Sequence, residues 1–246
     1  MKIVTVYFNS HDNTDYKLLL DVFRKSHYRH MPDVELVEIE LEQPDNPRSH
    51  IWNYNANSAK LAEWCRYMET ATEPVIFIDC DMIMLRPGYH AFDVDFDIAY
   101  CGHEAKGKIP FNGGVIFARP TDKAREFFRL WKESNDYLYN NPQEFNKWRK
   151  VYAGINQSAL GRLLEDIPYG AKVHRYPLVQ WNCTDSHWHE INEETVYVHI
   201  KGGLRRALLT RSSPSGPYEK AMNAWYAESG IEPLDEKKLQ VGNRWQ

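Results

Sequence analysis

The most restrictive feature of this sequence is a four-residue apolar run, Val-Ile-Phe-Ile at 75–78, that ends directly in Asp79-Cys80-Asp81. A short run of β-branched and aromatic side chains is typical of a strand buried on both faces, as in α/β sheets covered by helices. Ligands of open α/β sheets bind at the carboxyl ends of such strands. The run therefore predicts a central strand with two acids at the edge where a ligand binds.

The rest of the chain alternates between strand-like and helix-like segments. Apolar spacing predicts strands at 2–8, 34–41, 97–101, 115–118, 173–176 and 196–200. Helical spacing predicts helices at 15–30, 57–70, 121–134, 155–165 and 218–229. This order favours an α/β fold.

A chain of 246 residues can bury enough surface to fold without a disulfide or metal staple. The segment 212–217, Ser-Ser-Pro-Ser-Gly-Pro, interrupts the pattern. We expect a catalytic domain at 1–211, with 212–246 as a C-terminal helical extension and tail of the same domain.

The charge balance narrows the class of partner. With 30 Lys and Arg against 34 Asp and Glu, the net charge of −4 excludes bulk attraction to nucleic acid or anionic membrane as the main mode of action. No signal peptide is recognisable, and no apolar run approaches the roughly 18 residues of a membrane span. Four widely spaced cysteines indicate free thiols. We expect a cytoplasmic protein.

The acid pair is the first candidate site. Alternate side chains of a strand share a face, so Asp79 and Asp81 are expected to point together and Cys80 away. Two neighbouring carboxylates repel each other unless a cation lies between them, and Mg²⁺ or Mn²⁺ is commonly held by one or two carboxylates plus substrate phosphates. The alternative is a solvated acidic turn at a sheet edge.

A second candidate is Asn112-Gly113-Gly114, predicted to form a turn before the strand at 115–118. Two glycines let another group approach the backbone closely, and the Asn112 amide suits a hydroxyl-rich ligand. The alternative is an ordinary Gly-Gly turn.

A third candidate begins at His199, predicted at the end of a strand and followed by a flexible Gly202-Gly203 pair. Neutral imidazole is a competent metal ligand, and the surrounding basic side chains suit phosphates; these are Lys201, Arg205, Arg206 and Arg211. The alternative is a surface histidine beside a solvated basic loop. Taken together, the three candidates suit a nucleoside diphosphate that carries a sugar.

Six segments within residues 2–206 resemble, in order, those of the glycogenin-like family of GT-A glycosyltransferases. Lys60-Leu61 with Trp64 looks like its KLxxW helix, Asp79-Cys80-Asp81 is similar to its DAD, and the segment 111–115 resembles FNSGV. Residues 154–157 look like its GDQ or ADQ segment, and residues 176–182 like LPxxYN. His199, Gly202 and Arg205 fall on HxxGxxK. The resemblance implies the GT-A fold, with a Rossmann-like, mostly parallel central sheet flanked by helices.

The resemblance also implies a function: metal-dependent transfer of a sugar from a nucleotide-diphosphate donor, with UDP expected, to a hydroxyl acceptor with retention of anomeric configuration. Mn²⁺ or Mg²⁺ would be held by Asp79, Asp81 and His199. The implied catalytic residues are Gln157, beside the reacting face of the sugar, and Asn156. The implied donor-binding residues are Asn9, Tyr16, Lys60, Asn112, Gly113, Gly202 and Arg205.

Three departures from the family pattern matter. Asn156 replaces an Asp that normally engages a sugar hydroxyl, which leaves the donor sugar open. Arg205 replaces Lys and changes a point charge into a planar fork. The Pro-Trp that follows in the family is missing, since Arg206-Ala207 stands there. No counterpart of the glycogenin acceptor tyrosine is located, so self-glycosylation does not carry over.

The acceptor remains open between a glycan, a protein and a modified DNA base. Aromatic residues crowd the segment 131–152, either exposed for stacking on a ligand or packed as the core of a helical hairpin. An inverting reaction would need a base, which the polar loop with Asp185, His187, His189 and Glu190 could supply.

Two other readings of the acid pair stay as alternatives. One is a nucleotide-sugar-binding protein with weak or no turnover, for which Asn156 is the hint. The other is a haloacid-dehalogenase-type phosphohydrolase, which also has two Asp after an apolar strand.

Overall fold

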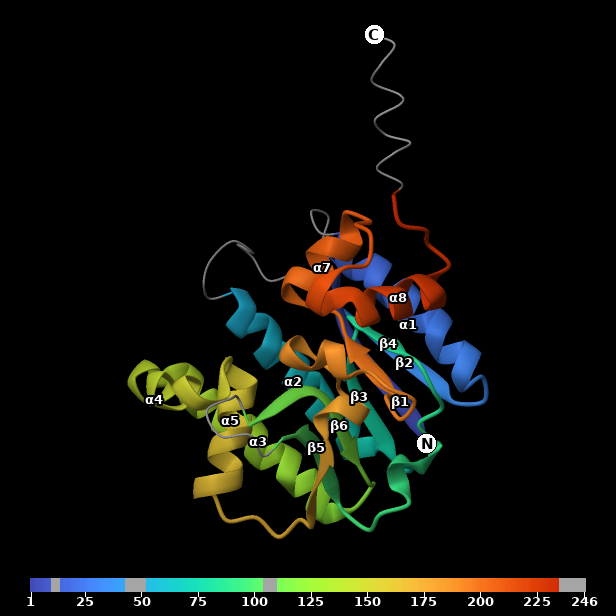
Figure 1. Cartoon of the computed structure of the whole chain (residues 1–246). Helices are drawn as coiled ribbons and strands as arrows, with labels where there is room; N and C mark the ends of the chain where they lie inside the picture. Colours follow the sequence, from blue (N-terminus) through green and yellow to red (C-terminus); the bar gives the residue numbers. More distant parts are fainter. Residues whose placement is uncertain (10–13, 43–51, 104–109, 235–246) are drawn as a thin grey trace, which may run out of the picture.

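A computed structural model describes residues 1–9, 14–42, 52–103 and 110–234. Its centre is a six-stranded sheet (Figure 1). In spatial order the strands are β2 (Glu35–Glu42), β1 (Lys2–Asn9), β3 (Val75–Asp79), β6 (Phe111–Ala118), β5 (Ile98–Gly102) and β7 (Val173–Pro177).

The sheet is mixed but mostly parallel, as the resemblance implied. β1 pairs in parallel with β2 and β3, and β5 with β7, whereas β6 runs antiparallel to both of its neighbours. β1, β3, β5 and β7 therefore all point the same way. Their carboxyl ends, and the first residues of β6, meet at one edge of the sheet, where the acid pair follows β3.

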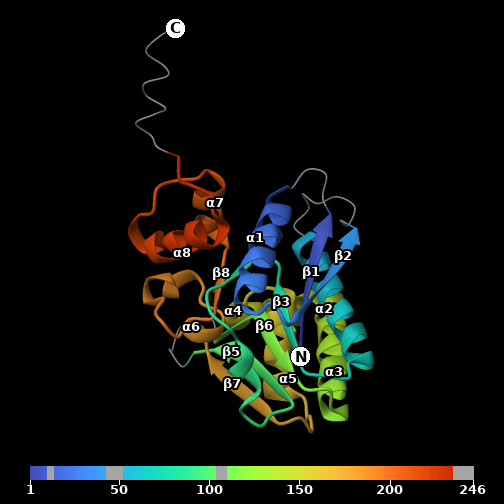
Figure 2. The same cartoon turned by 90° about the vertical axis from the view of Figure 1, so that its right-hand side faces the viewer.

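Helices cover both faces of the sheet (Figures 1 and 2). The α2, α3 and α5 helices lie on one face, and α1 lies on the other together with the C-terminal helices α7 and α8. The helix bounds are α1 (Thr14–His30), α2 (Trp52–Thr70), α3 (Asp122–Asn140), α4 (Pro142–Tyr152), α5 (Ile155–Asp166), α6 (Leu178–Trp181), α7 (Gly202–Leu209) and α8 (Glu219–Ser229). Short 3-10 helices are η1 (Tyr89–Phe92), η2 (Asp185–Glu190) and η3 (Gly216–Tyr218).

The alternating side chains of β3 explain why this strand is apolar throughout. Phe77 enters a core with Trp64 of α2 and Phe128 of α3, at ring-centroid distances of 5.5 Å and 5.0 Å. Ile76 and Ile78 enter the core on the opposite face, under α1. Because both faces are covered, a polar side chain has no place on β3 before its last residue.

A small second sheet links the acid pair to the C-terminal part of the chain. β4 (Met82–Met84) pairs antiparallel with β8 (Tyr197–His199). A third core cluster surrounds it, in which Met222 and Trp225 of α8 pack with Leu19 and Val22 of α1. The proposed division at residue 212 stays a prediction, although α8 shares this core with the first helix.

Two local predictions need correction. Gly113 and Gly114 were expected in a turn before a strand, but β6 begins at Phe111 and contains both. The register of β5 on β6 shifts between Tyr100 and Cys101, so the glycine pair lies in an irregular stretch of the strand, which the lack of a Cβ permits. Gly202 was expected in a flexible loop, but it opens α7 with φ at +56°, a conformation that favours glycine.

The aromatic segment is mainly core. Trp131, Phe145, Trp148 and Tyr152 are buried between α3, α4 and α5, whereas Tyr137 and Tyr139 are exposed. The hairpin interpretation therefore holds for most of these rings.

The four cysteines are buried free thiols. Within the described ranges, no helix is both long and apolar enough to cross a membrane.

Candidate active site

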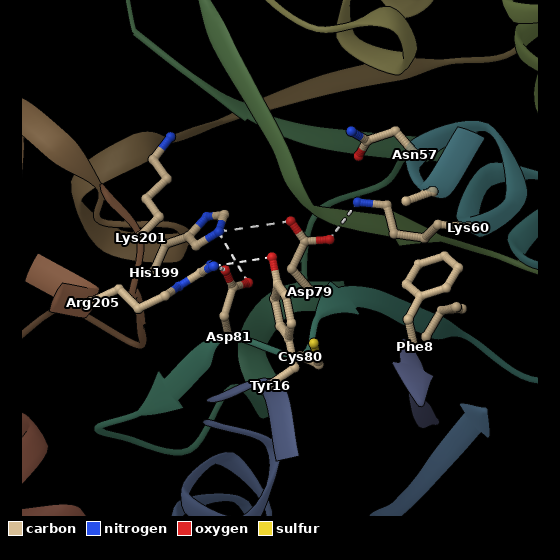
Figure 3. A pocket seen from close by; sticks show the side chains of 12 residues that line it. Phe8, Tyr16, Asn57, Lys60, Asp79, Cys80, Asp81, His199, Lys201 and Arg205 are labelled. Atoms are coloured by element: carbon tan, nitrogen blue, oxygen red, sulfur yellow. Dashed lines mark hydrogen bonds and ion pairs between the residues drawn. The ribbon is translucent and has the colours of Figure 1, made fainter. Parts of the chain in front are cut away.

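The acid pair meets His199 because two strands of the small sheet lie side by side. β3 ends at Asp79, and the chain passes through Cys80 and Asp81 into β4, whose Met82 pairs with His199. The His199 Nε2 atom lies 3.2 Å from Asp81 Oδ1 and 3.7 Å from Asp79 Oδ2 (Figure 3). The structure therefore brings together the three side chains that were predicted to converge.

The three side chains form a donor set that suits a divalent cation. One ligand atom from each lies within 4.8 Å of the others, and all three side chains are largely buried. Two carboxylates and a neutral imidazole are ligands that Mn²⁺ accepts, and carboxylates alone suit Mg²⁺. The residues therefore fit the metal that the resemblance implied.

Two cations from distant helices contact the same carboxylates. Lys60 of α2 forms an ion pair with Asp79, and Arg205 of α7 forms one with Asp81. Arg205 also donates from Nη1 to the Tyr16 hydroxyl at 3.0 Å and stacks over its ring at 4.7 Å. The Lys60 ammonium lies 4.7 Å from the centre of the Trp64 ring. Each acid is thus paired with a basic side chain.

The surrounding charges keep Asp81 ionised. Burial raises the pKa of Asp81, but the interaction with His199 and the charges of Arg205 and Lys60 outweigh burial and hold that pKa below its usual value. Burial lowers the pKa of Arg205, yet Asp81 and Tyr16 raise it above the ordinary value, so the guanidinium stays charged. Burial, with the acids on either side, raises the pKa of Cys80 well above normal, so this thiol is no nucleophile.

One cavity collects six of the predicted site residues, namely Tyr16, Lys60, Asp79, Asp81, His199 and Arg205. Lys201, named in the basic segment after His199, lines it as well, and so does Cys80, which was expected to point away from the acids. Sequence reasoning did not single out Val6, Phe8, Ala56 or Asn57. Proximity to the acids in the fold, rather than any local pattern, identifies them. Lys201 reaches this cavity while its ammonium pairs with Asp185 at 2.6 Å.

A second group of predicted residues lies beside this cavity rather than in its wall. Gln157, in the first turn of α5, accepts from the Gly113 N–H at 3.0 Å. Its Nε2 donates to the carbonyls of Tyr152 and Ala153 at 2.7 Å and 3.2 Å. The amide therefore ties β6 to the end of α4 and the start of α5, in one fixed orientation.

Asn156 and Asn112 are held just as firmly. Asn156 is buried, its Oδ1 accepts from the Gln157 N–H at 2.9 Å, and its carbonyl accepts from Trp131 Nε1 at 2.8 Å. Asn112 Oδ1 accepts from the Gly114 N–H at 2.9 Å and from Asn182 Nδ2 at 2.9 Å. Sequence reasoning gave Asn182 no role of its own and included it only in the motif segment 176–182. Its buried amide is the functional candidate that sequence reasoning missed.

For two predicted donor-binding residues, Gly202 and Asn9, the described residues give no contact that supports the role. Gly202 opens α7, and a Cβ built on it would meet nothing within 4 Å. Asn9 ends β1, but its side chain lies outside the part that the structure describes. Their roles remain predictions.

Solved structures with a similar fold are glycosyltransferases. One, involved in glycosylation of the major capsid of PBCV-1, has a TM-score of 0.56 at 14% identity, covering 84% of this chain and 97% of its own. The galactosyltransferase LgtC, solved with donor and acceptor sugar analogues, has a TM-score of 0.55 at 13% identity, and the match covers 98% of this chain and 99% of LgtC. Apo GlyE of Streptococcus pneumoniae TIGR4 has a TM-score of 0.58 at 16% identity, covering 98% of this chain and 64% of its own.

At these identities the structural likeness establishes the GT-A fold. No curated protein matches the chain by sequence. The family model for nucleotide-diphospho-sugar transferases matches residues 65–206, which is more than half of the chain and spans the acid pair, Asn112, Gln157 and His199. The predicted family is thereby confirmed at this level, without singling out its glycogenin-like branch. This chain belongs to the nucleotide-diphospho-sugar transferase family.

Proposed function

We propose that this glycosyltransferase moves a sugar from a nucleoside diphosphate, with UDP as the expected nucleotide, to a hydroxyl acceptor in a reaction that depends on Mn²⁺ or Mg²⁺. The observation that carries the proposal is the contact of Asp79, Asp81 and His199 in a cavity that also holds Lys60 and Arg205. An acid pair for a cation beside two basic side chains matches a diphosphate with its metal.

The basic groups have a defined task in this reaction. Negative charge grows on the diphosphate as the glycosidic bond breaks, and Lys60 and Arg205 stabilise it from a partly desolvated position. Asp79, Asp81 and His199 would hold a divalent cation, which would supply Lewis-acid neutralisation of part of that charge. The cavity, about 220 Å³ in volume, suits the diphosphate portion better than a whole nucleotide sugar.

We propose retention, with Gln157 beside the reacting sugar. Its amide is held by three backbone groups, which suits an orienting residue rather than a proton acceptor. The acceptor hydroxyl then attacks from the leaving-group side, and the departing phosphate takes its proton. Two of the groups considered for an inverting base are already in ion pairs, Asp185 with Lys201 and Glu190 with His187.

For the acceptor we propose a second cavity of about 380 Å³ at the same edge of the sheet. It is bounded by Gly102 at the end of β5, Pro177 at the end of β7, and His187 and Glu190 of η2. Its polar rim suits a sugar hydroxyl.

Membership of the transferase family excludes the haloacid-dehalogenase alternative, and a binding protein with weak turnover is separated from an enzyme by the experiment below.

The test is a panel of nucleotide sugars titrated by calorimetry with and without Mn²⁺, combined with an assay for donor hydrolysis. We expect metal-dependent binding of one donor, with slow hydrolysis in the absence of acceptor. In Asp81→Asn we expect both to be lost. The matched control is Asp97→Asn, because Asp97 accepts hydrogen bonds from Thr121 and Lys172 at the opposite end of β5.

Each outcome distinguishes the alternatives. Binding that requires metal in the wild type and in Asp97→Asn, but is absent in Asp81→Asn, supports the proposal. Binding with neither hydrolysis of the donor nor transfer of its sugar to an added glycan favours a binding protein. No binding of any donor contradicts the proposed site.

A further inference from the structure

We propose that Asn182 is a positioning residue, which accepts a hydrogen bond from His199 Nδ1 and so holds the imidazole with Nε2 facing Asp79 and Asp81. The inference rests on the proposed function, since it concerns one ligand of the proposed metal site. It assigns to a residue outside the cavity the task of preparing that ligand before any ion arrives.

The orientation of the Asn182 amide follows from a neighbour that can only accept. Asn182 directly follows α6, is 0% exposed, and has its Nδ2 3.2 Å from the backbone carbonyl oxygen of Asn112. A backbone carbonyl has no proton to donate, so the amide group that faces it must be the NH₂. The same NH₂ donates to Asn112 Oδ1 at 2.9 Å. The other end of the amide is therefore the oxygen.

That oxygen determines the tautomer of His199. Asn182 Oδ1 lies 3.3 Å from His199 Nδ1, and an amide oxygen can only accept a hydrogen bond. Nδ1 therefore carries a proton, and Nε2 is the ring nitrogen left for the acids or for a cation held between them. Nε2 is the nitrogen that faces the two carboxylates. A partner at one ring nitrogen that readies the other for metal is the usual arrangement around metal-bound histidines.

Glycine at position 114 leaves room for the ring in this orientation. A Cβ on Gly114 would lie 2.8 Å from His199 Cε1 and 2.9 Å from Nδ1, so the imidazole packs directly on the backbone of β6. The His199 backbone is held as well: its N–H donates to Cys183 at 2.9 Å and its carbonyl accepts from Trp188 at 3.1 Å. What remains to be set is the ring itself, and Asn182 is the polar group at Nδ1.

The same amide connects the proposed metal ligand to the proposed donor contact. Asn112 Oδ1 is used by Gly114 and Asn182, which leaves the Asn112 NH₂ as its hydrogen-bond donor. Asn182 thus orients His199 at one end and Asn112 at the other. We expect a loss of this amide to disturb the metal site and the sugar contact together.

The first test needs neither metal nor variant activity. In ¹⁵N-histidine-labelled protein without metal, the ring nitrogens of His199 report whether Nδ1 carries a proton. Because the chain has 10 histidines, the signal is assigned by its loss in His199→Asn. We expect the Nδ1–H form. A His199 whose Nδ1 carries no proton overturns the proposal, whether or not any Asn182 variant folds.

The second test measures Mn²⁺ binding by electron paramagnetic resonance in two Asn182 variants. Asn182→Leu keeps much of the volume but removes the acceptor, and we expect a mixed tautomer and Mn²⁺ affinity weaker by about 10- to 100-fold. Asn182→Asp keeps an acceptor at Nδ1 but turns a second oxygen toward Asn112, so it should preserve the proton on Nδ1 while losing the contacts to Asn112. The control is Asn135→Ala, a buried amide that donates to Ser58 on α2, for which we expect wild-type Mn²⁺ affinity.

The two proposals fail in different ways. If the wild type binds no Mn²⁺, the proposed metal site is wrong. If the wild type binds Mn²⁺ and Asn182→Leu binds it equally well with an unchanged His199 tautomer, only the role of Asn182 is wrong.

Discussion

The two groups of site residues are built on opposite principles. Around Asp79 and Asp81 the side chains are ionised, and they contact one another across strand and helix boundaries. Around Gln157 and Asn112 the side chains are neutral amides, and most of their hydrogen bonds go to backbone groups. One region is an assembly of charges, and the other is an extension of the backbone framework.

The difference indicates what each region does when a substrate arrives. Charged side chains held mainly by each other can exchange partners, and Lys60 and Arg205 carry the charge that a diphosphate would attract. Amides held by backbone groups have little freedom and present fixed hydrogen-bonding positions. We therefore expect the charged region to control metal binding and the amide region to control the geometry of the sugar.

Removing both acids should have the largest effect. In Asp79→Asn/Asp81→Asn the two carboxylate charges are lost while side-chain size is kept, and we expect metal-dependent turnover to fall by at least about 10³-fold. Turnover within tenfold of the wild type, measured with the donor identified by the panel, would contradict the assignment. Asp97→Asn again serves as the control for a lost carboxylate.

The amide region should respond differently. In Gln157→Ala we expect kcat to fall by about 10- to 100-fold with unchanged Mn²⁺ affinity. We also expect a loss of about 1–3 kcal/mol in the free energy of unfolding, because the Gly113 N–H loses its acceptor. Steady-state kinetics and urea titration measure the two effects. The control is Gln143→Ala, an exposed position of α4, and a parallel loss of Mn²⁺ binding in Gln157→Ala would break the comparison.

Gly114 lies where the two regions touch. In Gly114→Ala the added methyl group would meet the His199 ring and Asn112 Oδ1, each at 2.8 Å. We expect a shifted ring and an Mn²⁺ affinity weaker by about tenfold, since overpacking of this kind costs about 1–3 kcal/mol. Gly170→Ala is the control, because a Cβ there meets nothing within 4 Å. Equal affinity in both variants would show that the ring has room to adjust.

The smallest expected effect concerns a buried histidine outside both regions. Burial lowers the pKa of His27 in spite of the hydrogen bond at 2.7 Å to the Val34 carbonyl. The unfolded chain therefore binds the proton first, and the free energy of unfolding should fall as the pH drops below about 6.5. Urea titrations at several pH values check this. His27→Gln should show a shallower dependence, whereas exposed His189→Gln should follow the wild type.

Much of the architecture follows from local patterns. The apolar run before Asp79 predicts a doubly covered central strand, and alternation or helical spacing places the other main elements within a few residues of their observed bounds. The β6 strand was predicted too short because its glycines read as a turn. Their place in the strand depends on His199 and Gln157, which pack against them from distant parts of the chain.

The sequence by itself determined the α/β order, the acids at the end of a buried strand and the family, since these depend on short-range periodicity and on motif residues. Only the tertiary structure decided which charges pair and which ring nitrogen Asn182 faces. Arg205 reaches Asp81 across 124 positions of the chain, and Asn182 reaches Asn112 across 70. Such partners are selected by the packing of β4 on β8 and of α7 on α1, and no local pattern encodes them.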